Sequence, residues 1–131
     1  MNRQEVFDTV YRHLMKQGRQ SYSKDVPTAG GCMYRSPNGN KCAIGCLIPD
    51  EMYNKDIEGL SVFHDEVSDI LKKIYPDATE KDLNFLAVLQ DTHDDLDNDK
   101  TNNYENFRPL LNEAMKENAY RWNLEFNYSS N

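Results

Sequence analysis

Apolar residues recur at steps of three and four along four stretches of the chain, the spacing that places them on one face of an α-helix. The first stretch has helix signals at both ends: Asn2 and Glu5 suit a capping box, and Gly18 suits a C-terminal stop. A later stretch begins at Thr79, which can be capped in the same way through Asp82. We therefore expect four helices, over residues 2–17, 61–74, 79–93 and 106–119.

Between the first two of these helices the sequence predicts a tight β-hairpin. Residues 36–40, Ser-Pro-Asn-Gly-Asn, favour a type I turn in which Gly39 takes the left-handed position of a three-residue loop. The turn places Arg35 opposite Lys41, a like-charge pair that is unfavourable unless an anion or a carboxylate relieves it. The exposed face of the hairpin should hold Met33, Arg35, Lys41 and Ala43. The core face should hold Cys32, Tyr34, Cys42 and Ile44.

The C-terminal segment has the two-residue alternation of a half-buried strand. Its apolar positions are Trp122, Leu124, Phe126 and Tyr128. We expect this strand to pair with the hairpin in a small antiparallel sheet. The expected fold is therefore α+β, one globular domain over residues 1–131, with the sheet packed against four to five helices. Pro49, at the first position of a short helix, accounts for the fifth.

Charge is distributed unevenly along this chain of 131 residues, whose net charge is −7. Residues 1–41 contain seven Lys or Arg and only three Asp or Glu residues, whereas the remainder is strongly acidic. This balance argues against duplex nucleic acid as a partner. It leaves a small anionic ligand, or a host protein that meets the acidic face, as partners, and it leaves a homo-oligomer open. The N-terminus lacks a signal-peptide pattern and no segment resembles a membrane span, so we expect a cytoplasmic protein.

Three cysteines, Cys32, Cys42 and Cys46, are too few for a secreted disulfide framework. Their spacing does not match the paired ligands of a structural zinc site, so we expect no metal and no cofactor. The favoured interpretation is that they are small buried side chains. The alternative is a catalytic thiol at Cys42 or Cys32, which needs a neighbouring base and a lowered pKa.

The candidate base is His93, which follows Gln90 at the end of the apolar face of the third helix. Both side chains must find hydrogen-bond partners if they are buried there. They could be satisfied structural groups, or they could contact the hairpin as part of a ligand or catalytic site.

The hairpin and the segment after it could hold a small anion. Two cations, aromatic surfaces and a helix N-terminus at Pro49 would come together there. The candidate ligand-binding residues are Tyr34, Arg35, Lys41, Glu51, Tyr53, Gln90 and His93. The alternative is that the tyrosines fill the core and the charged groups face water.

Residues 32–53, which we call the cassette, have the pattern C-x-Y-R-x-P-N-G-x-K-C-A-I-G-x-L-I-P-D-E-x-Y. With the later L-Q-x-x-H-D at residues 89–94, this pattern resembles a family of short phage- and prophage-associated proteins. The resemblance covers most of the chain, but it implies no catalytic residue. It implies a small accessory protein that acts inside the host cell, by binding a host protein or by sequestering a small signalling molecule.

These observations give three hypotheses. The first is a non-enzymatic, anti-defence phage protein that binds a small, anionic, nucleotide-like signal near Tyr34, Arg35 and Lys41. The second is a hydrolase or transferase that uses Cys42 (or Cys32) and His93. The third is an inhibitor that uses its acidic face against a host protein.

Overall fold

The computed structural model describes residues 1–22, 33–96 and 104–128, and within these ranges the protein is helical. Within the same ranges, no helix combines the length and the apolar character needed to cross a membrane. The α-helices are α1 (Arg3–Gln17), α2 (Asp65–Ile74), α3 (Glu80–Asp94) and α4 (Phe107–Arg121). Short 3-10 helices are η2 (Gly45–Leu47), η3 (Asp50–Met52), η4 (Lys55–Ile57) and η5 (Tyr104–Asn106).

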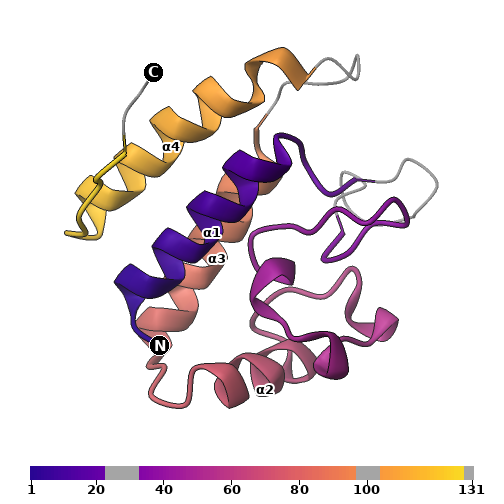
Figure 1. Ribbon diagram of the computed structural model, residues 1–131. Coiled ribbons are helices and arrows are strands. Elements are labelled where there is room, and N and C mark those ends of the chain that lie inside the picture. The colour runs from indigo at the N-terminus through magenta and orange to yellow at the C-terminus, as the bar shows by residue number, and fades with distance from the viewer. Residues whose placement is uncertain (23–32, 97–103, 129–131) are drawn as a thin grey trace.

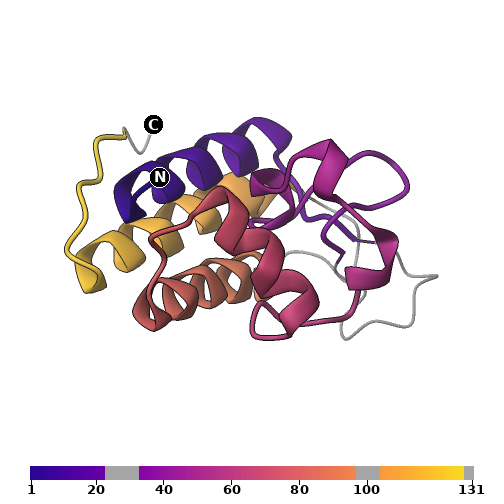
Figure 2. The same ribbon diagram turned by 90° about the horizontal axis from the view of Figure 1, so that it is seen from below.

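The helices α1 and α3 lie side by side at the centre of the molecule (Figure 1). Helix α4 packs against both of them on one side, and the cassette lies on the other side, where η2 contacts α1 (Figures 1 and 2). The cassette is therefore held by its packing against the central helix pair.

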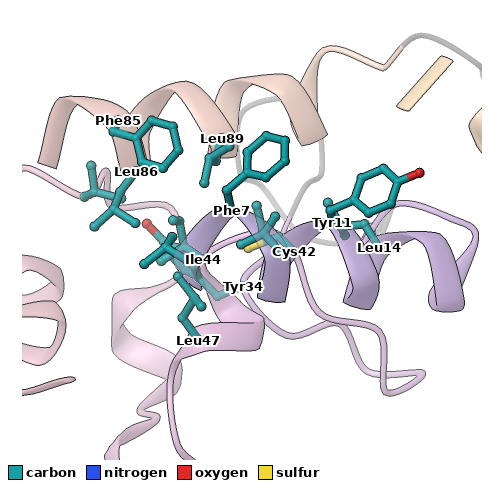
Figure 3. Packing of buried hydrophobic residues seen from close by; sticks show 14 of the residues in the cluster. Phe7, Tyr11, Leu14, Tyr34, Cys42, Ile44, Leu47, Phe85, Leu86 and Leu89 are labelled. Carbon is teal, nitrogen blue, oxygen red and sulfur yellow. The ribbon is translucent and has the colours of Figure 1, made fainter. Parts of the chain in front are cut away.

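One apolar cluster joins α1, α3 and the cassette (Figure 3). Phe7 of α1, Phe85 and Leu89 of α3, and Cys42 and Ile44 of the cassette are all completely buried. Burying a phenylalanine, leucine or isoleucine side chain stabilises a fold by about 1.5–3 kcal/mol. The cassette is thus part of the hydrophobic core, and its conformation is coupled to the stability of the whole protein.

The two ends of α1 and the start of α3 agree with the local sequence signals, whereas α2 begins four residues after the expected residue 61. Asn2 and Glu5 form the capping box of α1, and Thr79 and Asp82 form that of α3. Gly18 ends α1 in the left-handed conformation, with φ of 73°. These predictions are confirmed. They could be made from sequence because each cap depends on hydrogen bonds between residues three or four positions apart.

The expected α+β fold is wrong, because the described residues contain no strand and no sheet. The turn itself has the predicted register: Arg35 and Lys41 form an isolated antiparallel bridge, and the amide of Ser36 donates to the carbonyl of Asn40. The pairing stops after one bridge because the chain turns into η2. Ala43, expected on the exposed face, is completely buried beside Ile44.

The predicted C-terminal strand is also wrong. Helix α4 continues to Arg121, a turn follows at residues 122–123, and residues 124–128 form no strand among the described residues. Instead, the side-chain amide of Gln4 on α1 bonds both backbone groups of Glu125, at 2.9 and 3.0 Å. Tyr128 stacks on Tyr11 of α1, with 4.0 Å between the ring centroids. The alternation of apolar and polar residues in this segment therefore results from half-burial against helix α1, and not from a β-strand.

Acidification should weaken the junction between α1 and α3. Burial alone would raise the pKa of Asp82, but hydrogen bonds from Thr79 and from Arg3 outweigh it and lower the pKa. Because the folded-state pKa lies below that of the unfolded chain, this contribution to stability is present above about pH 4 and is lost as the pH falls through the folded-state value. In urea titrations, Asp82→Asn should flatten the fall in unfolding free energy below pH 4. If the unfolding free energy of Asp82→Asn fell below pH 4 as steeply as that of the parent protein, Asp82 would not be the group responsible.

Candidate functional site

The two cations of the turn meet a carboxylate from the same chain. The guanidinium of Arg35 lies 2.8 Å from Asp50 of η3, and the ammonium of Lys41 lies 3.9 Å from the same carboxylate. The like-charge pair is therefore relieved by Asp50. Since the Asp50 side chain is 84% exposed, water screens this interaction, and we assign it no more than about 1 kcal/mol.

Arg35 is held firmly in place. Its Nη2 donates to the carbonyl of Ile48 at 2.6 Å, and its guanidinium lies 4.6 Å from the centre of the Tyr53 ring. Its Nε atom is buried and has no hydrogen-bond partner among the described residues. An unpaired buried donor is unfavourable, so this atom marks a place where an acceptor would be stabilised.

Glu58, which the sequence did not single out, fixes the conformation of the cassette. Its two carboxylate oxygens accept the backbone amides of Tyr34 and Arg35, at 2.8 and 3.1 Å. The hydroxyl of Tyr53 donates to the same carboxylate at 2.7 Å. One side chain thus takes backbone donors that the expected sheet would have paired with another strand.

A partly enclosed pocket of about 270 Å³ lies between residues 58–63, the segment that begins with Glu58, and α3. Of the predicted ligand residues, Tyr34 and Gln90 line it, whereas Arg35, Lys41, Glu51, Tyr53 and His93 do not. Its full lining is Met33, Tyr34, Glu58, Gly59, Leu60, Ser61, Val62, Phe63, Ala87, Gln90, Asp91 and Asp94. The wall formed by residues 58–63 was expected to be loop and the start of a helix, so no sequence signal pointed to it.

Tyr34 and Gln90 connect the pocket to the cassette. The hydroxyl of Tyr34 donates to the carbonyl of Leu60 at 2.5 Å, and its buried position raises the pKa of the phenol. The side-chain carbonyl of Gln90 accepts the amide of Ile44 at 3.1 Å, and its amide donates to Asp94 at 2.9 Å. Both residues hold the wall of the pocket, while their own polar atoms are already paired.

His93 is a satisfied structural histidine. It is completely buried, and its Nε2 accepts the backbone amide of Ser21 at 3.0 Å, so that atom carries no proton. The proton on Nδ1 is donated to Asp94, 2.8 Å away. Both ring nitrogens are used, which leaves none to serve as a base for Cys42.

Cys42 also lacks the properties of a nucleophile. Its side chain is completely buried, and burial raises the pKa of the thiol far above its ordinary value. Burial likewise raises the pKa of Cys46 to about 12. A reactive cysteine needs a lowered pKa and access to solvent. The alternative nucleophile Cys32 lies outside the described residues.

The remaining candidates do not form a separate centre. Glu51 is exposed on η3, and the hydroxyl of Tyr53 is bonded to Glu58. Within the described ranges, no group of three or more His, Cys, Asp or Glu side chains is arranged to hold a metal ion.

Cys42 and Cys46 should therefore react slowly with iodoacetamide near neutral pH in the native protein. Thiolate is the reacting form, and burial disfavours it at both positions. Peptide mass mapping should show that both become modified at the rate of a free thiol only after unfolding in guanidinium. Fast native labelling of Cys42 that slows in His93→Gln would contradict this account and support the Cys/His hydrolase or transferase.

Comparison of the chain with family models, with curated proteins and with solved structures gives no match.

Proposed function

We propose that this protein is a phage accessory protein that acts in the host cell by binding, and that it counters a host defence by holding a small ligand in the pocket between residues 58–63 and α3. The observation on which the proposal rests is the pocket itself. Its wall includes Tyr34 and Val62, which are part of the hydrophobic core. Preformed, partly apolar concavities with a few polar groups are the usual form of small-molecule sites. The resemblance of the cassette supports the phage context.

Binding is favoured over catalysis because the candidate catalytic groups are already used. His93 has both nitrogens paired and Cys42 is a buried thiol with a raised pKa. A rigid wall is useful for binding because little conformational freedom is lost when the ligand enters.

A second location, for a nucleotide-like anion, is favoured by one specific observation. Arg35 has a buried, unpaired Nε atom, and its guanidinium and the ammonium of Lys41 already meet a carboxylate. An anionic ligand would replace Asp50, whose side chain is largely exposed and can move away. The pocket remains the first location because it is a partly enclosed space of known lining, and neither Arg35 nor Lys41 contributes to that lining.

Thermal denaturation with a panel of amines, neutral metabolites, cyclic nucleotides and ADP-ribose tests the proposal. A ligand at 100 times its Kd adds about 2.7 kcal/mol to stability, which raises the Tm of a domain of this size by about 10 °C. Ala87→Leu, which fills the pocket from α3, should abolish the increase, whereas Arg35→Ala and Lys41→Ala should preserve it.

Two outcomes decide against the pocket. If Ala87→Leu responds like the parent protein and Arg35→Ala does not respond, the ligand binds beside Asp50. If no compound in the panel changes the Tm, small-molecule binding is rejected, and salt-sensitive capture of a host protein becomes the test of the acidic-inhibitor hypothesis.

A further inference from the structure

Acidic groups line the pocket, and among the residues that the structure describes they have no Lys or Arg partner. Glu58, Asp91 and Asp94 contribute carboxylates to its wall, and no Lys or Arg does so within the described ranges. In the same ranges, none of these carboxylates forms an ion pair with Lys or Arg. The cassette cations are directed at Asp50 instead. A partly enclosed site lined by one sign of charge concentrates ligands of the opposite sign.

The acidic groups at this end of α3 also repel one another. Partial burial is the largest cause that raises the pKa of Asp91, followed by the charges of Asp95 and Asp94. A cation in the pocket would be attracted to Asp91 and Asp94 together and would relieve their mutual repulsion. An anion would add to the repulsion.

Apolar and aromatic groups complete the wall of the pocket. Leu60, Val62 and Ala87 line it together with Phe63. Phe63 is 54% exposed, so a ligand can reach it from solvent. The face of an aromatic ring attracts an ammonium or guanidinium group, so Phe63 and the carboxylates favour the same kind of guest.

We propose that the pocket selects a compact organic cation, in which an ammonium or guanidinium group is attached to a small aromatic or aliphatic body. This inference rests on the proposed binding function and specifies the ligand class of the same site. A volume of about 270 Å³ is just below the range of about 300–1,000 Å³ that is typical of ligand sites, and this favours a small amine over a nucleotide.

Titration calorimetry with tyramine and agmatine tests this inference. The neutral analogue N-acetyltyramine is the matched ligand control, since it keeps the ring and loses the charge. Asp91→Asn and Phe63→Ala should each weaken tyramine binding by at least about fivefold, the size expected when a carboxylate or a cation–π partner is lost. The matched protein control is Asp69→Asn on α2, which removes the same charge at an exposed position outside the pocket lining and should leave Kd within about twofold. Binding should weaken as salt is raised from about 0.01 to 0.5 M.

The outcomes separate this inference from the function on which it rests. If N-acetyltyramine binds as tightly as tyramine, or if Asp91→Asn behaves like Asp69→Asn, the choice of a cation is overturned while binding in the pocket stands. If AMP or ADP-ribose binds and both amines do not, the cation is again rejected and an anion site is supported. If no probe binds, both proposals are rejected. Circular dichroism of each variant verifies that it is folded.

Discussion

Gly45→Ala is expected to destabilise the protein by about 3 kcal/mol, one of the largest effects of any single methyl group in this chain. A Cβ atom at this position would lie 1.9 Å from the carbonyl oxygen of Tyr34 and 2.8 Å from its carbonyl carbon. Both are backbone atoms, so a side-chain rotation cannot remove the clash. To remove the clash, the backbone at Tyr34 would have to move away from the backbone at Gly45. This movement would disturb the hydrogen bond that the amide of Cys42 donates to the same oxygen.

Gly39→Ala is the matched control, because it adds the same methyl group to the same cassette. Gly39 has φ of 91°, but no atom lies within 4 Å of a Cβ built there. Gly39→Ala should lower the free energy of unfolding by only about 1 kcal/mol, because the sole cause is backbone strain. Urea denaturation measures both variants. Equal losses for Gly39→Ala and Gly45→Ala would contradict the close contact between Tyr34 and Gly45.

His93→Ala is expected to be similarly damaging, at about 3 kcal/mol, although His93 is not assigned a catalytic role. The substitution leaves a cavity in the core, deprives the buried amide of Ser21 of its acceptor and leaves Asp94 without one donor. The loss should be visible as a lower midpoint in urea with an unchanged slope.

His93→Gln separates the structural role from a chemical one. A glutamine side chain can place its carbonyl oxygen near the position of Nε2, so it can still accept the amide of Ser21. We expect it to recover about half of the lost stability and to leave ligand binding in the pocket unchanged. If His93→Ala were as stable as the parent protein, the structural assignment of His93 would be wrong.

The two ends of α1 and the start of α3 could be predicted from sequence because they depend on local interactions, whereas α2 begins at Asp65 and not at residue 61 as expected. The capping box of Asn2 and Glu5 and the left-handed Gly18 involve only neighbouring turns of one helix. The register of the turn at residues 36–40 is local in the same sense, and it is confirmed by the bridge between Arg35 and Lys41. Such features require no knowledge of what packs against them.

The sheet could not be predicted correctly because alternation specifies half-burial and not a hydrogen-bond partner. Residues 124–128 alternate in exposure as expected, but the backbone of Glu125 bonds to the side chain of Gln4, more than a hundred residues away in sequence. The amides of Tyr34 and Arg35 are likewise taken by Glu58. A side chain that replaces a strand leaves no periodic signal in the sequence.

The candidate site was located only in part for the same reason. Tyr34 and Gln90, two of the residues predicted to bind a ligand, line the pocket, but its acidic character comes from Glu58, Asp91 and Asp94, which tertiary packing brings together. Local charge predicted an anion or a carboxylate near Arg35 and Lys41. It could not predict that Asp50, nine positions beyond Lys41, would pair with both cations.

The location of ligand-induced shifts in amide NMR spectra tests the account most directly. During titration with tyramine, the resonances that move most should belong to residues 58–63 and 87–94, on the two walls of the pocket. The amides of Lys41 and Asp50 should move little, because neither residue lines the pocket. Shifts concentrated at those two residues, or no shifts with any amine or nucleotide, would contradict the account.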